Sequence, residues 1–198
     1  MATLTAGFAD PVLAAQATFR AVMDATARPG TVVPVIDTVA APPPLAAATA
    51  AVALTLVDGD TPVWLDPRLA AGPEVAAWLR FHTGAPLVDR PADAAFAILA
   101  DPASAPPFEH FSIGTLDDPD RSATLILQVE RFDDGAPLVL SGPGIADRAT
   151  LRVAPLPPDM VARLTANRAL FPRGVDLILT AGHAVAALPR SVMPVMER

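Results

Sequence analysis

The chain has 198 residues, of which 52% are hydrophobic, and it carries a formal net charge of −7. It contains no cysteine and no lysine, so all 14 basic residues are arginines. These absences exclude disulfides, thiolate nucleophiles, iron–sulfur clusters, a P-loop lysine and a Schiff base to pyridoxal phosphate. The acidic balance, with no basic run, argues against a nucleic-acid partner. The length predicts a single domain over residues 1–198.

A helix is predicted at the start of the chain. Asp10 followed by Pro11 is typical of an N-cap and a first helical position, and the helical pattern continues to about Ala27. Arg20 and Asp24 are four residues apart, which allows an ion pair on the helix surface. Residues 31–36 then favour a strand. Apolar spacing predicts that the buried face of the helix carries Val12, Ala15, Phe19, Val22 and Thr26.

The sequence LAAATAAVALTLVDGDTPVWL at 45–65 predicts a buried helix, a stop and a short buried strand. Gly59 can adopt the left-handed conformation that ends a helix, and the strand would cover 63–65. Asp58 and Asp60 flank this glycine. They could be metal ligands, but a solvated turn is the favoured interpretation.

No membrane or export segment is indicated. The apolar run at 46–57 is shorter than the roughly 20 residues that a membrane-spanning helix needs. No basic residue precedes Arg20, and no apolar run ends in a cleavage-like site. We therefore expect a cytoplasmic protein that does not enter the membrane.

A further helix is predicted from Pro73, with Gly84 as its stop. Its last turn gathers Arg80, His82 and Thr83. A cation at this end is favoured by the helix dipole, so one interpretation is electrostatic capping beside a packed histidine. The other is a cluster that contacts an anion at a subunit or domain edge, in which His82 can change charge near neutral pH.

Residues 94–99 favour a strand, and residues 100–120 are a poorly patterned stretch that we interpret as a long loop with a turn of helix. Glu109 and His110 could be considered a metal pair. However, adjacent helical side chains diverge, and the three histidines are scattered along the chain. No metal site is predicted.

The clearest strand is SATLILQVE at 122–130, which should lie near the middle of a sheet. A strand at 137–140 precedes Ser-Gly-Pro-Gly, which has the opening of a dinucleotide fingerprint. Asp147 replaces the third glycine and Pro143 lacks an amide, so a simple turn is favoured. Ser141 lacks the glycine two positions earlier that a nucleophile elbow uses, so a hydrolase is not indicated.

A helix beginning at Asp159 and a hairpin of two strands, 175–180 and 184–188, complete the pattern. His183 should lie in the turn of this hairpin. Interleaved helices and strands predict an α/β layered fold, and the hairpin makes its sheet mixed. No catalytic constellation emerges from these elements.

Several segments, taken in order, resemble the PhnH family, a subunit of the bacterial carbon–phosphorus lyase core complex. They are QATFRAVMDATARPG (16–30), LTLVDGDTPVWL (54–65), LRFHTGAPLV (79–88), ATLILQV (123–129), GPGIA (142–146), FPRGVDLILT (171–180) and LPR (188–190).

This resemblance implies a three-layer α/β/α sandwich with a mixed sheet, similar to the large domain of pyridoxal-phosphate-dependent transferases but without the cofactor. It implies a homodimer that assembles with the PhnG, PhnI and PhnJ subunits. Together these subunits take part in transferring the ribose triphosphate moiety of ATP to an alkylphosphonate during phosphonate catabolism.

Two hypotheses follow from the resemblance and the missing catalytic set. The first is a dimeric assembly subunit without independent activity, in which Asp60, Thr61, Arg80, His82 and Thr83 contact a ligand or an interface. The second is a stand-alone enzyme that handles phosphate or phosphonate groups through Arg80 and His82. Catalytic residues are not assigned by the sequence.

Overall fold

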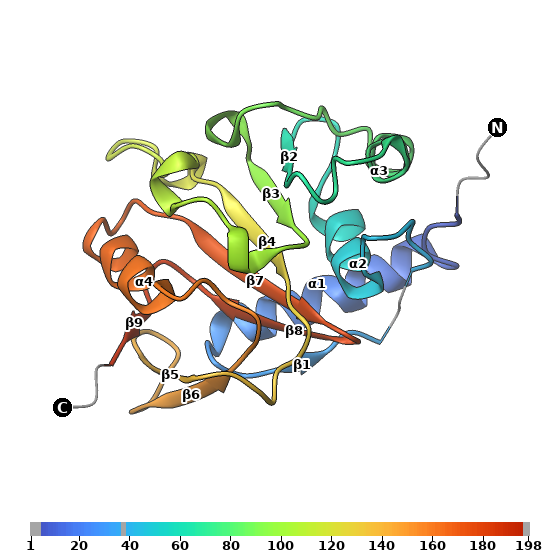
Figure 1. The fold of residues 1–198 in the computed structure, drawn as a ribbon. Helices are drawn as coiled ribbons and strands as arrows, with labels where there is room; N and C mark the ends of the chain where they lie inside the picture. The colour runs from blue at the N-terminus through green and yellow to red at the C-terminus, as the bar shows by residue number, and fades with distance from the viewer. Residues whose placement is uncertain (1–4, 37–38, 196–198) are drawn as a thin grey trace.

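The computed structural model describes residues 5–36 and 39–195 (Figure 1). The helices are α1 (Pro11–Ala27), α2 (Ala47–Leu56), α3 (Pro73–Thr83) and α4 (Met160–Ala169). The strands are β1 (Val33–Pro34), β2 (Val63–Leu65), β3 (Phe96–Leu99), β4 (Thr124–Gln128), β5 (Pro137–Ser141), β6 (Ala149–Arg152), β7 (Asp176–Ala181), β8 (Ala184–Leu188) and β9 (Met193–Pro194). Within these described ranges, no helix combines the length and apolar character needed to cross a bilayer.

The main sheet has six strands in the order β1-β8-β7-β4-β3-β2. β2, β3, β4 and β7 are parallel, whereas β8 and β1 are antiparallel to their neighbours. The prediction of a mixed α/β sheet with 122–130 near its middle is therefore confirmed. The predicted hairpin is β7–β8, and its turn contains Gly182, with φ of 53°, and the exposed His183.

Alternate residues of the parallel strands face two separate cores. Ile98, Ile126 and Ile178 stand side by side in register on one face of the sheet. Leu125 and Leu177, one position earlier in their strands, are paired on the opposite face. The parallel strands are apolar on both faces, so each face of the sheet must be buried under its own layer of helices or strands.

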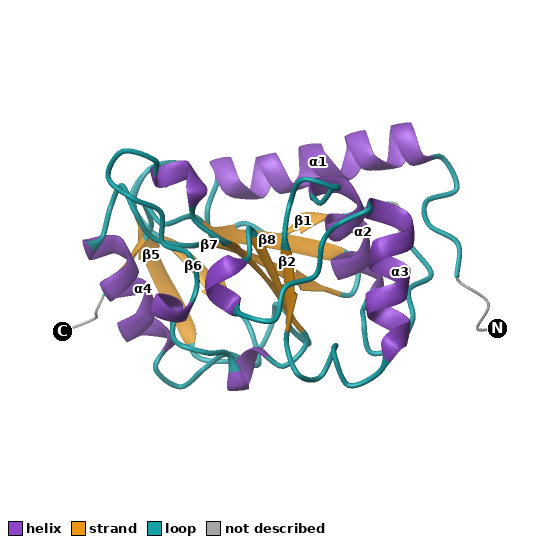
Figure 2. Cartoon of the chain, turned by 90° about the horizontal axis from the view of Figure 1, so that it is seen from above, coloured by secondary structure: helices purple, strands orange, loops and turns teal. Residues whose placement is uncertain are grey.

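The two faces are covered differently (Figure 2). Residues of α1, α2 and α3 complete the core on one face. The other core is completed by α4, by the short 3₁₀ helix Phe108–His110 and by the second sheet. Helices thus lie on both faces of the main sheet, but a small sheet shares one of the two outer layers.

The predicted buried face of α1 is wrong except at Val22, which is buried. Asp10 does cap the helix, and its carboxylate accepts a hydrogen bond from the Leu13 amide at 3.1 Å. However, Val12 is 77% exposed and Phe19 is 48% exposed. The face that contacts α2 and β8 consists mainly of small residues, which allow close approach: Ala14, Thr18, Ala21, Val22 and Ala25.

The predicted ion pair between Arg20 and Asp24 is also wrong. Asp24 pairs instead with Arg28, one turn further along, at 3.5 Å. Both side chains are well exposed, so this pair contributes little to stability. Over residues 5–36 and 39–195, Arg20 makes no ion pair.

The helix, stop and strand predicted at 45–65 are present, but the stop differs. α2 ends at Leu56, where the following Val57 adopts an extended conformation with φ of −107° and ψ of 136°. Gly59 is not in the left-handed region, so it does not end the helix. Asp58 and Asp60 are exposed in the turn that follows, as the solvated-turn interpretation predicts. In α3, by contrast, Gly84 is the left-handed stop, with φ of 74°.

A second sheet was not predicted as a unit. β5 pairs with β6 on one side and with β9 on the other, all antiparallel. No helix follows the Ser-Gly-Pro-Gly segment, which confirms that it is not a dinucleotide fingerprint. The predicted strand at 31–36 is reduced to two residues, and 100–120 is a loop with short 3₁₀ helices at Pro102–Ser104, Phe108–His110 and Pro119–Arg121.

Candidate functional site

The structure places the predicted site residues in two adjacent segments, the turn after α2 and the last turn of α3. The backbones of Gly59 and Gly84 join these segments, since a Cβ atom built on Gly84 would lie 3.7 Å from the Gly59 Cα. The residues carried by the two segments are Asp60, Thr61, Arg80, His82 and Thr83.

His82 is a packed histidine that tethers the start of the chain. Its Nε2 lies 3.0 Å from the carbonyl oxygen of Thr5, and the Trp78 Nε1 donates to the same oxygen at 3.0 Å. The His82 ring packs 4.7 Å from the Trp78 ring, centroid to centroid. Gly7 packs on the Nδ1 side of the ring so closely that a Cβ atom on Gly7 would lie 3.1 Å from Nδ1. The ring therefore fixes the N-terminal segment on α3.

The two threonine hydroxyls are engaged close to their own backbone. Thr83 donates to the Leu79 carbonyl at 2.7 Å and accepts a hydrogen bond from the Ala85 amide at 3.1 Å. The Thr61 hydroxyl accepts from the Asp58 amide at 2.7 Å and donates back to oxygens of the same residue. Both hydroxyls shape the ends of their segments.

Arg80 differs from its neighbours because it is exposed and makes no ion pair within the described ranges. It borders a cavity of about 250 Å³ whose other walls include Trp64, Leu87 and Asp89. Residues two apart on a helix point in different directions, and Arg80 and His82 indeed contact different surroundings. The structure does not combine them into one constellation.

Asp66 is a buried carboxylate that the sequence analysis did not single out. It directly follows β2, is only 3% exposed, and accepts backbone amide hydrogen bonds from Leu69, Ala100 and Asp101 at 2.8–2.9 Å. It therefore ties the carboxyl end of β2 to that of β3. An aspartate placed directly between a buried strand and Pro67 was the available signal.

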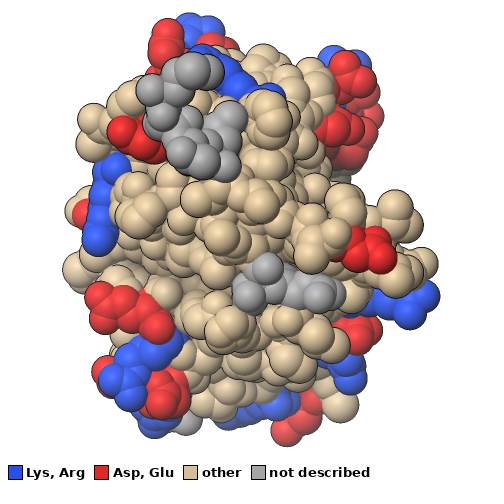
Figure 3. Space-filling model, turned by 90° about the vertical axis from the view of Figure 1, so that its right-hand side faces the viewer, with Lys and Arg blue, Asp and Glu red and all other residues tan. Residues whose placement is uncertain are grey.

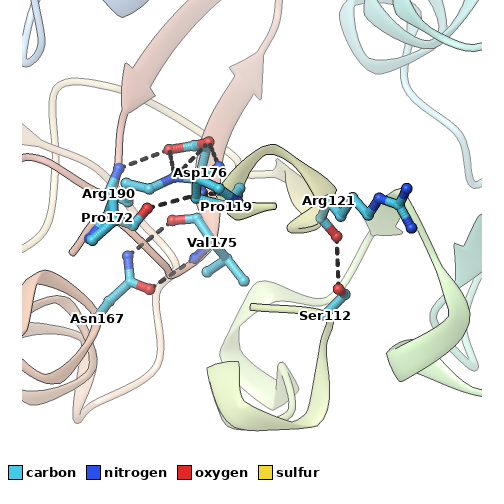
Figure 4. A network of polar contacts seen from close by, with 8 residues as sticks. All are labelled: Ser112, Pro119, Arg121, Asn167, Pro172, Val175, Asp176 and Arg190. Atoms are coloured by element: carbon cyan, nitrogen blue, oxygen red, sulfur yellow. Dashed lines mark hydrogen bonds and ion pairs between the residues drawn. The ribbon is translucent and has the colours of Figure 1, made fainter. Parts of the chain in front are cut away.

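A second polar network joins two of the segments that carry the family resemblance (Figure 4). Asp176, from FPRGVDLILT, forms an ion pair with Arg190, from LPR, and the side chains are 32% and 15% exposed. Arg190 also donates to the Pro119 carbonyl at 2.6 Å. Beside it, the Asn167 amide group bonds both the N–H and the carbonyl of Val175 at 2.8 Å. These motifs hold the entry to β7 in place.

Gln128 performs the capping that α2 lacks in its own sequence. Its Oε1 accepts from the Ala46 amide at 2.7 Å and from the Thr49 hydroxyl at 3.2 Å. Its Nε2 donates to the Pro44 carbonyl at 2.9 Å, and Thr49 continues to the Thr180 hydroxyl at 2.7 Å. The network fixes the start of α2 over β4 and β7.

An exposed ion pair lies in the loop after β4. The pKa of Asp133 is lowered, chiefly by a hydrogen bond from Arg131, but both side chains are exposed in the loop after β4. No group of three or more potential metal ligands occurs in residues 5–36 and 39–195.

Comparison with known proteins gives the family. Residues 6–194 match the family described as "Bacterial phosphonate metabolism protein (PhnH)". The chain is 48% identical over 185 residues to the alpha-D-ribose 1-methylphosphonate 5-triphosphate synthase subunit PhnH of Rhizobium meliloti (strain 1021), covering 93% of this chain and 92% of that protein. It is 35% identical over 179 residues to the putative C-P lyase subunit protein HtxG of Stutzerimonas stutzeri, covering 89% and 83% respectively. The chain belongs to the PhnH family.

Proposed function

We propose that this chain is a subunit of a carbon–phosphorus lyase core complex that acts in phosphonate catabolism. In that complex it would serve, with partner subunits, in the synthesis of ribose 1-methylphosphonate 5-triphosphate from ATP and methylphosphonate. The family and the names of the two relatives support this proposal. We place the complex in the cytoplasm.

Its role in the complex is mainly structural. The chain forms a homodimer and contacts PhnG, PhnI and PhnJ. The engaged hydroxyls of Thr61 and Thr83 and the packed ring of His82 support a role in contact over a role in chemistry. The fold is related to the large domain of pyridoxal-phosphate-dependent transferases, which the mixed sheet with helices on both faces supports. A chain without lysine cannot form the internal aldimine of those enzymes.

An exposed apolar surface supports the proposal of an assembly subunit. At the end of the molecule where α3 lies, charged side chains occupy the rim and leave a broad uncharged area (Figure 3). Segments that Figure 1 places at this end expose large apolar side chains, including Ile36 at 81% and Phe81 at 67%. Val12 and Leu13, at the start of α1, add to this surface. Exposed apolar surface with a polar rim is typical of protein interfaces.

Co-purification with the partner subunits, followed by native mass spectrometry, tests the proposal. Phe81→Asp and Ile36→Asp should each reduce the amount of complex recovered, because they place a charge in the apolar surface. Leu116→Asp is the matched control, since Leu116 is 72% exposed in the loop between the 3₁₀ helices Phe108–His110 and Pro119–Arg121 and should not affect assembly. Equal recovery of all three variants would argue against this surface, and failure of the unaltered chain to assemble would refute the proposed role.

A second candidate function is an enzyme that uses Arg80 on a phosphate or phosphonate group. The observation in its favour is the exposed Arg80 beside a cavity of about 250 Å³. Arg80→Ala and His82→Ala should then abolish activity while the complex still assembles. Unchanged turnover of ATP and methylphosphonate in both variants would exclude this role, as would a complete lack of turnover by the purified chain alone.

A further inference from the structure

A separate cavity lies between α4 and the second sheet. It has a volume of about 420 Å³ and draws on the end of β5, the second half of α4 and the start of β9. Most of its lining surface is apolar, with Ala169 and Met193 beside Ser141, Gly142, Thr165, Arg168 and Ser191. None of these residues belongs to the site discussed above. The volume is within the range of small-molecule sites, roughly 300–1,000 Å³.

Arg168 is the charged group of this cavity. Its guanidinium carbon lies 4.9 Å from the centre of the Phe171 ring, a cation–π contact that restrains the side chain through one face. The N–H groups of this guanidinium form no hydrogen bond or ion pair with any residue in 5–36 or 39–195. Stacking on an aromatic face leaves the in-plane donors of a guanidinium available for an anion.

Arg163, on the same helix, shows what a structural arginine looks like in this fold. Its guanidinium bonds the Asp159 carboxylate at 2.8 Å and the carbonyls of Ala105 and Pro106, also at 2.8 Å. Arg168 has no such set of partners in the described part of the chain. Its position near the end of α4 is favourable for a cation, but a pure dipole contact does not require a cavity lined by hydroxyl groups.

Two serine hydroxyls in the lining are also without a protein partner across the described residues. Ser141 ends β5 and Ser191 precedes β9, so both are carried on backbone that β5–β9 pairing holds. Gly142, next to Ser141, packs closely on the backbone at Ser191, since a Cβ atom there would lie 2.9 Å from the Ser191 carbonyl oxygen. Thr165 contributes less, because its hydroxyl donates to the Val161 carbonyl at 2.8 Å.

We propose that this cavity binds a small oxyanion that carries a phosphoryl or phosphonyl group. A restrained guanidinium and two free hydroxyls can donate to several oxygens of one tetrahedral group, and charge-assisted bonds of this kind are the strong ones. No carboxylate belongs to the lining, so nothing in it repels an anion. This inference is independent of the assembly role, because the cavity belongs to one chain.

Calorimetric titration of the purified full chain with inorganic phosphate, methylphosphonate and ATP tests the proposal and separates the possible sources of the group. At least one of the three should bind. Arg168→Gln should weaken that binding by about tenfold or more, and Ser141→Ala and Ser191→Ala each by several-fold. The control is Arg20→Gln, an exposed change of equal charge on α1, which packs on the other face of the main sheet.

A thermal unfolding scan of each variant shows whether it has folded. If Arg168→Gln is unfolded, Arg168→Lys provides the second test, since it keeps the charge and loses the planar donor pair. Binding of none of the three anions by the unaltered chain, or equal binding by the folded Arg168 variant and the Arg20 control, would overturn the proposal. Loss of complex assembly without loss of anion binding would affect only the proposed assembly role.

Discussion

Replacing Asp66 with alanine should destabilise the fold strongly. The carboxylate is 3% exposed and receives three backbone amide hydrogen bonds, from Leu69, Ala100 and Asp101. Hydrogen bonds to charged groups contribute about 1.5–3 kcal/mol each, and buried amides left without a partner carry a further cost. Because such terms are not additive, we expect a loss of about 3–5 kcal/mol in the free energy of unfolding.

Asp66→Asn should cost less than Asp66→Ala. Asparagine keeps the shape of the side chain and one acceptor oxygen, but its NH₂ group must then face one of the amide donors. The expected loss is about 1–3 kcal/mol, the cost of one mismatched buried donor. The order of stability should therefore be wild type, Asp66→Asn, Asp66→Ala.

Urea unfolding followed by tryptophan fluorescence measures this series directly, because Trp64 lies two residues from the substitution. For a chain of this length, a loss of 1 kcal/mol lowers the melting temperature by about 2–4 °C, so Asp66→Ala should melt about 10 °C below wild type. Asp147→Ala, in an exposed loop, is the control. A change under about 1 kcal/mol for Asp66→Ala would show that the three amides are not held by this carboxylate.

Three further outcomes are expected. In a double-mutant cycle with Asp176→Ala and Arg190→Ala, monitored by urea unfolding, the coupling energy should be about 1–3 kcal/mol, since the pair is partly buried and hydrogen-bonded; a value near zero would contradict this. Gln128→Ala should lower the free energy of unfolding by about 1–3 kcal/mol because it uncaps α2, and an unchanged urea midpoint would refute that role. The pKa of Asp133 lies below its ordinary value and should rise in Arg131→Gln, as an NMR pH titration can measure; an unshifted titration would exclude the hydrogen bond from Arg131 as its cause.

The elements with strong local signals could be predicted from the sequence. The apolar strands β4 and β7, the capped start of α1 at Asp10 and the left-handed end of α3 at Gly84 all follow from residue type and spacing. The orientation of α1 did not follow, because its packing selects small residues, whereas hydropathy selects large ones such as Phe19. Close approach between helix and sheet has no signature in hydrophobic spacing.

The same distinction applies to the site. Sequence reasoning correctly treated Asp58 and Asp60 as members of a solvated turn and His82 as packed in one of its two interpretations. It did not single out Asp66. The position of this aspartate after a buried strand was a local signal, but two of the amides that it bonds come from a segment up to 35 residues away. Nor could sequence reasoning find the cavity at Arg168, which exists only after β5 and β9 pair. Sites assembled by long-range pairing leave no local pattern.

The tether at Thr5 has a consequence for how the chain reaches its final form. Its carbonyl accepts hydrogen bonds from Trp78 and His82, which lie 73 and 77 residues later. During synthesis the first residues therefore have no docking site until α3 has left the ribosome, and closing such a long segment is slow compared with forming a local helix. An affinity tag or fluorophore placed before Thr5 would perturb this late docking step. The same label at the opposite terminus would leave the docking step undisturbed.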